Sequence, residues 1–190
     1  MSLKSEQILK NTKKYFQTSQ DQGFMTDELM NFLGENFIKA PASTMKDLHN
    51  AFEGGLIDHL LRVTKYGVSI NETLIPENLK LDKKDVIKVC FLHQIGKAHL
   101  YMPCTSEWHR TNQGKMYDFN DEMVSMRVGE RSAYYALSNG VSLTEEEYQA
   151  IVNYDKDDTD KQAKHHTSMH GKILKMANEL AIIEEKNLYK

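Results

Sequence analysis

The sequence predicts an all-α fold, a helical bundle that carries one small inserted β-hairpin. Apolar residues recur three and four positions apart along most of the chain, which is the helical period. The 190 residues include 3 prolines, which leaves long uninterrupted stretches for helices. Short apolar runs divided by a turn occur between residues 108 and 119. This length fits a single core, and we expect an N-terminal helical arm over residues 1–44 and the main domain over residues 45–190.

Composition narrows the class of protein. Hydrophobic residues make up 40% and charged residues 27%, as in globular domains, and the formal net charge is −3. That balance argues against an extended nucleic-acid surface and against binding to anionic membranes. Cys90 and Cys104 are too few for a disulfide scaffold and form no C-x-x-C pair. Because no apolar stretch matches a signal peptide or a membrane span, we expect a cytoplasmic protein.

The first half of the chain is predicted to be helices with one sharp corner. Apolar residues lie on one face of residues 5–18, with lysines outside. Thr26 is a helix cap, and the pattern that follows it stops near Pro41. Ser43 or Thr44 could cap a further short helix, and Gly54-Gly55 turns the chain into the next one. The expected helices cover residues 5–18, 26–41, 43–48 and 56–68.

The second half is predicted to hold the buried centre of the bundle. Residues 82–92 are apolar nearly all round, which is typical of a central helix. The hairpin is expected to pair the runs 108–110 and 116–119 across Asn112-Gln113-Gly114. Residues 155–164 are predicted to form a polar, charged loop. Further helices are expected over residues 124–137, from residue 143 onward, and over residues 168–186.

Histidines are the residues that bear on chemistry. His49, His59 and His93 lie at or near helix ends around the glycine corner and the central helix, so three separated segments could converge. A neutral imidazole binds divalent metals through one ring nitrogen. Taken singly, each is more often a core or capped residue than a ligand. Their order along the chain makes a shared site the better interpretation.

Two segments carry a family resemblance. The segment from His49 to His59 reads H-N-A-F-E-G-G-L-I-D-H, and the segment 91–97 reads F-L-H-Q-I-G-K. They resemble the HD superfamily of metal-dependent phosphohydrolases, whose pattern is H-x-A-x-x-G-G-L-x-x-H followed by L-H-D-I-G-K. The resemblance spans roughly residues 45 to 185, through 127–132, 143–147 and 174–181. The inserted hairpin is similar to that of small HD proteins from bacteria and their phages.

The resemblance implies a metal site that has degenerated. It assigns ligand positions to His59, His93, Gln94 and Asn178, and in active members the last two are aspartates. Further family histidines fall near residues 127–128 and 153–154, where this chain has none. Because a hard cation is held largely by charge, two neutral amides replace two carboxylates poorly. We therefore expect no cofactor and no metal-dependent hydrolysis.

An anion site could survive this loss. Lys97 follows the doublet as in the family, and Arg127 and Arg131 lie one helical turn apart. These cations, together with His49, are the expected binding residues for a nucleotide or another phosphorylated small molecule. The plainer alternative is that the arginines form salt bridges with Glu130 or Asp155 and that Lys97 is a solvated charge.

Two other interpretations stay open. The chain could still be a hydrolase, with a divalent metal held by His59, His93, Gln94 and a substitute carboxylate such as Asp155 or Glu130. It could instead be a scaffold or inhibitor whose helix over residues 5–18 docks on a protein partner. His165, His166 and His170 are interpreted as surface residues, although His166 and His170 have a spacing that could serve a metal.

Overall fold

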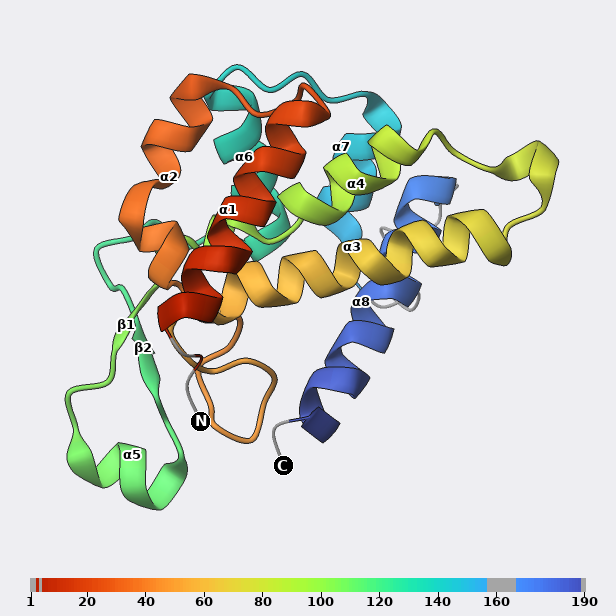
Figure 1. Cartoon of the computed structure of the whole chain (residues 1–190). Coiled ribbons are helices and arrows are strands. Elements are labelled where there is room, and N and C mark those ends of the chain that lie inside the picture. Colours follow the sequence, from red (N-terminus) through yellow and green to blue (C-terminus); the bar gives the residue numbers. More distant parts are fainter. Residues whose placement is uncertain (1–2, 4, 157–166, 189–190) are drawn as a thin grey trace.

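The computed structural model describes residues 3, 5–156 and 167–188. These contain eight α-helices and a two-stranded antiparallel sheet (Figure 1), so the all-α class with a small β element is confirmed. Among the described residues, no helix combines the length and apolarity that a bilayer crossing needs. The α-helices are α1 (Ser5–Asp21), α2 (Asp27–Lys39), α3 (Gly55–Thr73), α4 (Lys83–Leu92), α5 (Glu107–Gln113), α6 (Val128–Ser138), α7 (Glu145–Asn153) and α8 (Met169–Leu188). Two short 3-10 helices, η1 (Glu77–Leu79) and η2 (Ile95–Lys97), flank α4.

Helix α3 is the long central element, and α4 and α8 pack along it (Figure 1). Gly67 permits the close approach, because a Cβ there would lie 2.8 Å from Cys90 Sγ and 3.7 Å from the Cβ of Ala177. The core between the three helices is made of fully buried aliphatic residues. It includes Leu56, Leu60, Val63, Val86, Val89, Ile173, Leu174 and Ala181.

The two N-terminal helices share this core. Tyr15 of α1 is fully buried, stacks on Phe91 with ring centroids 4.4 Å apart, and donates its hydroxyl to the Phe91 carbonyl at 2.9 Å. Phe37 of α2 lies 5.1 Å from the same tyrosine ring. Thr26 caps α2, accepting the backbone N–H of Leu29 at 3.0 Å, as predicted. The inner face of α1 therefore packs on the domain core.

The short helix predicted over residues 43–48 is wrong. This segment is an irregular loop, and its backbone pairs with the segment after α5. Lys46 N–H donates to the Gly114 carbonyl at 2.7 Å, and Met116 N–H donates to the Thr44 carbonyl at 2.8 Å. A helix this short is only marginally stable by itself. The hydrogen bonds to residues 114–116 therefore determine the conformation of residues 43–48.

The hairpin prediction is right in kind and wrong in the position of its first strand. Strand β1 (Tyr101–Pro103) pairs antiparallel with β2 (Tyr117–Phe119), whereas residues 108–110 belong to α5 between them. Ser106 caps α5, and Gly114 ends it in the left-handed conformation, φ 66°. Because caps at both ends stabilise α5, residues 108–110 are helical, although their short apolar pattern predicted a strand. Helix α6 also begins later than predicted, at Val128.

Candidate functional site

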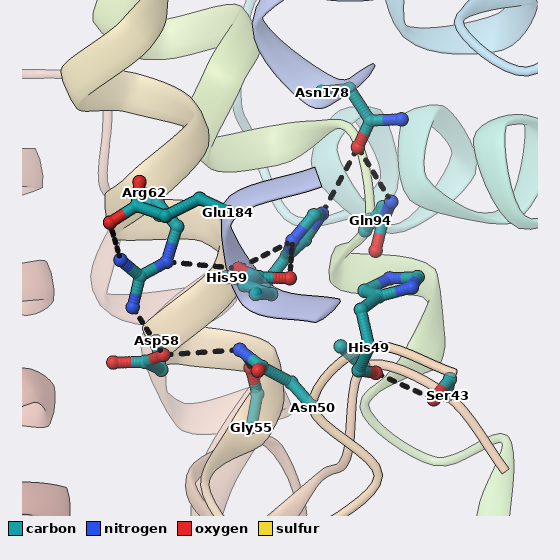
Figure 2. A network of polar contacts seen from close by, with 12 residues as sticks. Ser43, His49, Asn50, Gly55, Asp58, His59, Arg62, Gln94, Asn178 and Glu184 are labelled. Carbon is teal, nitrogen blue, oxygen red and sulfur yellow. Dashed lines mark hydrogen bonds and ion pairs between the residues drawn. The ribbon is translucent and has the colours of Figure 1, made fainter. Parts of the chain in front are cut away.

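The structure brings together His59, His93, Gln94 and Asn178, the four positions to which the resemblance assigns metal ligands, and Figure 2 labels His59, Gln94 and Asn178. His59 lies in the second turn of α3, His93 and Gln94 follow α4, and Asn178 lies midway along α8. His59 Nε2 is 3.0 Å from Asn178 Oδ1, and Gln94 Nε2 donates to the same oxygen at 3.4 Å. The rings of His59 and His93 are 6.0 Å apart.

Two glycines place these side chains. Gly55 opens α3, where a Cβ would lie 2.2 Å from the Asn50 carbonyl oxygen, so the helix starts tightly against the preceding loop. Gly96 lies in the turn after Gln94, where a Cβ would lie 2.7 Å from the Val128 carbonyl oxygen of α6. These backbone approaches explain why the segments that resemble the family contain glycine at both positions.

The histidines of the cluster are kept neutral by burial. His59 and His93 are fully buried, and burial lowers the pKa of each to about 3. His49 lies 4.9 Å from the His59 ring, and its pKa falls to about 2, first through burial and then through the charge of His59. His93 Nδ1 contacts the Cys90 carbonyl oxygen at 2.8 Å. The Nε2 atoms of His49 and His93 are buried and have no hydrogen-bond partner among the described residues.

Lys97 inserts a positive charge beside this cluster. Its side chain is 7% exposed, and its ammonium donates to Gln94 Oε1 at 2.7 Å and to the Ala42 carbonyl oxygen. Burial lowers the pKa of Lys97 to about 8, so the group stays largely charged at neutral pH. A chain of polar contacts therefore runs from Lys97 through Gln94 and Asn178 to His59.

The sequence interpretation missed Glu185, the carboxylate that orients His59. Glu185 is fully buried, and its Oε2 lies 3.0 Å from His59 Nδ1. Burial raises the pKa of Glu185 to about 8. Arg62 contacts Glu185 through Nε at 3.2 Å and also pairs with Glu184 at 2.7 Å and Asp58 at 3.1 Å (Figure 2). Glu185 follows Asn178 by two helical turns, so helical spacing from Asn178 would have placed both on one face.

The four residues to which the resemblance assigns metal ligands do not fit a hard divalent cation. His59, His93, Gln94 and Asn178 supply no carboxylate, and the Lys97 ammonium is bonded to one of the amides. A different group lies next to them. His49, His59 and Glu185 each offer a ligand atom within 4.8 Å of the others, the one such group of three in the described part of the chain.

Glu130 and Asp155, the two carboxylates considered as substitute metal ligands, have other contacts. Glu130 Oε2 accepts the Arg127 backbone N–H at 3.4 Å at the start of α6. Asp155 follows α7 and acts on Lys97 through its charge. The carboxylate bonded to the cluster is Glu185.

The fold places the residues predicted to share an anion site in two separate locations. Arg127 and Arg131 line one surface pocket of about 340 Å³. The Arg131 guanidinium is largely buried and donates to the Val124 carbonyl at 2.7 Å. Lys97 and His49 belong to the buried cluster instead. Thus His49 and Lys97 lie together, and the two arginines lie together at a separate surface.

Cys90 and the three histidines near the C-terminus are the remaining candidates. Burial raises the pKa of the Cys90 thiol to about 12, which is unfavourable for a nucleophile. His170 lies in the first turn of α8. His165 and His166 lie outside the described residues, as does most of the predicted connection 155–164.

Comparisons of this chain with models of known protein families, with curated proteins and with solved structures gave no match.

Proposed function

We propose that this chain is an HD-like domain whose metal site has degenerated, and that it binds a nucleotide or another phosphorylated ligand without metal-dependent hydrolysis. The observation that supports this best is the position of Lys97. Its ammonium donates to Gln94 Oε1 at 2.7 Å, beside the histidines and amides that converge from three helices.

The chemistry follows from the charges of the cluster. A metal-dependent hydrolase uses its cation to acidify a bound water and to neutralise phosphate oxygens. Here the two positions that would bring negative charge to a cation are the amides Gln94 and Asn178. The histidines are neutral at pH 7, and Lys97 brings a fixed positive charge. Burial raises the pKa of Glu185 to about 8, so this group is mostly protonated at pH 7, and the resulting charge balance favours an anion over a divalent cation.

One observation favours the alternative of an active hydrolase. His49, His59 and Glu185 form a compact group of possible ligands, and neutral imidazoles with a carboxylate are a donor set that zinc accepts. Against this, Glu185 is already bonded to His59 and to Arg62, so a metal would have to displace both contacts.

Metal content and turnover separate the two proposals. Protein purified without chelator is analysed for bound metal, and phosphate release from ADP is followed with added Mg²⁺, Mn²⁺ or Zn²⁺. We expect no stoichiometric metal and no metal-stimulated release. Turnover that requires metal and disappears in His93→Gln, a variant that keeps a polar side chain at that position, would overturn the non-hydrolytic proposal.

A further inference from the structure

A cavity of about 550 Å³ lies between the loop that precedes α3 and the segment around α5. Its walls include Lys46, Leu48, Asn50, Phe52, Arg110 and Met116. Backbone hydrogen bonds from Lys46 to Gly114 and from Met116 to Thr44 tie the two walls together, so the cavity is built into the fold. Its volume falls within the usual range for sites that hold small molecules.

Lys46 and Arg110 give this cavity two cations, one from each of its two walls. Lys46 comes from the loop and Arg110 from α5, and both are exposed. Within the described residues neither side chain forms an ion pair or a hydrogen bond, in contrast to Arg62 and Lys97. An ammonium and a guanidinium without acidic partners are a ready site for phosphate oxygens.

The rest of the wall suits the body of a nucleotide. Leu48, Phe52 and Met116 offer apolar surface to a ring. Asn50 adds a specific acceptor: its amide nitrogen donates to Asp58 at 3.1 Å and to the Gly55 carbonyl at 3.3 Å, which fixes the other end of the amide as oxygen. That oxygen is buried and has no hydrogen-bond partner among the described residues. A buried acceptor left unpaired is costly unless a ligand donates to it.

We propose that this cavity is the nucleotide-binding site of the protein. The phosphate lies between Lys46 and Arg110, the base packs on the apolar wall, and an N–H or O–H of the ligand donates to Asn50. The inference rests on the proposed function for the class of ligand, and it places the phosphate contacts at Lys46 and Arg110 instead of at Lys97, Arg127 and Arg131. Because Asn50 directly follows His49 and bonds Asp58, the site adjoins the histidine cluster.

Calorimetric titration of the full chain with ADP, in the presence of EDTA, tests the site. Lys46→Ala and Arg110→Ala should each weaken ADP binding about ten- to a hundredfold, since each removes a charge-assisted contact to phosphate. The matched control is Arg127→Ala, another exposed arginine at another pocket, and it should bind ADP as the parent does. Adenosine, which lacks the phosphates, should bind more weakly than ADP by a similar factor.

The outcomes distinguish this inference from the proposed function. If the parent binds ADP and both Lys46→Ala and Arg110→Ala bind it equally well, the cavity is not the site, whereas the proposed function stands. Weakening in Arg127→Ala alone would place the ligand at the other pocket. A parent that binds no ADP at millimolar concentration would overturn both. Unchanged melting temperatures are expected for all three variants, because the substituted side chains are exposed.

Discussion

Acidification should unfold this protein through its buried histidines. His49, His59 and His93 have folded-state pKa values of about 2, 3 and 3, against about 6.5 in an unfolded chain. Between pH 6.5 and pH 3 the unfolded state therefore binds more protons at these positions than the folded state does. Stability falls as the pH falls whenever the unfolded state binds more protons.

Glu185 acts in the opposite direction and sets the optimum. Burial raises its pKa to about 8, so between pH 4.5 and pH 8 the folded state holds a proton that the unfolded state lacks. This group alone makes stability decrease as the pH rises through that window. At pH 6.5 the three unfolded histidines together still hold more than one proton, so their effect exceeds that of Glu185 until about pH 7, and above that pH the effect of Glu185 prevails. The free energy of unfolding should be greatest near pH 7.

The size of the acid effect follows from the proton balance. Between about pH 6 and pH 4.5, three histidines favour the unfolded state and Glu185 cancels one of them, which leaves two protons. Each proton changes stability by about 1.4 kcal/mol per pH unit, so the slope is about 3 kcal/mol per pH unit. Two pH units would remove about 5 kcal/mol, much of the stability of an ordinary domain.

Urea unfolding followed by circular dichroism from pH 8 to pH 4.5 measures this slope. His93→Gln keeps a hydrogen-bonding side chain but cannot titrate, so its slope should be shallower by about one proton, or about 1.4 kcal/mol per pH unit. His109→Gln, in α5 and outside the cluster, is the matched control and should keep the parent slope. A parent whose stability is flat between pH 6.5 and pH 5, or a slope that His93→Gln leaves unchanged, would refute this reasoning.

Three further substitutions test other parts of the structure. Gly96→Ala should lower the free energy of unfolding by about 1–3 kcal/mol in urea titrations, because its Cβ would meet backbone atoms of α6. Arg62→Ala should cost about 3 kcal/mol, more at pH 9 than at pH 6, because it leaves ionised Glu185 buried without its cation; an equal loss at both pH values would argue against this. The double variant Gln94→Asp with Asn178→Asp should bind Mn²⁺ more tightly than the parent in calorimetry, because it adds two carboxylates beside His59 and His93. Unchanged affinity in the folded double variant would show that these two carboxylates do not suffice for a metal site.

The sequence predicts the helices better than the irregular segments. Caps and apolar periodicity are local features, and they predicted the Thr26 cap and the buried helix over residues 82–92, which the structure confirms as α2 and α4. Residues 43–48 were misassigned because the bonds that hold them come from Gly114 and Met116, which lie far along the chain. The first strand was misplaced because Ser106 and Gly114 bound a helix that the short apolar pattern concealed.

The candidate site was also predicted only in part. The convergence of His59, His93, Gln94 and Asn178 was predicted through the resemblance of two short segments, and the described structure brings these residues together. Glu185 escaped notice because a carboxylate on a helix is ordinarily solvated, and only its burial against His59 gives it a role. The separation of Lys97 from Arg131 depends on side-chain direction, which spacing along a helix does not determine.

The most direct test of the central claim is one calorimetric titration of the parent protein with ADP, performed in EDTA and repeated with Mn²⁺, with phosphate release measured on the same samples. The proposal of a metal-independent, non-hydrolytic binder predicts the same affinity in both titrations and no phosphate release in either. Binding or phosphate release that occurs only with Mn²⁺ would contradict it and would restore the metal-dependent hydrolase.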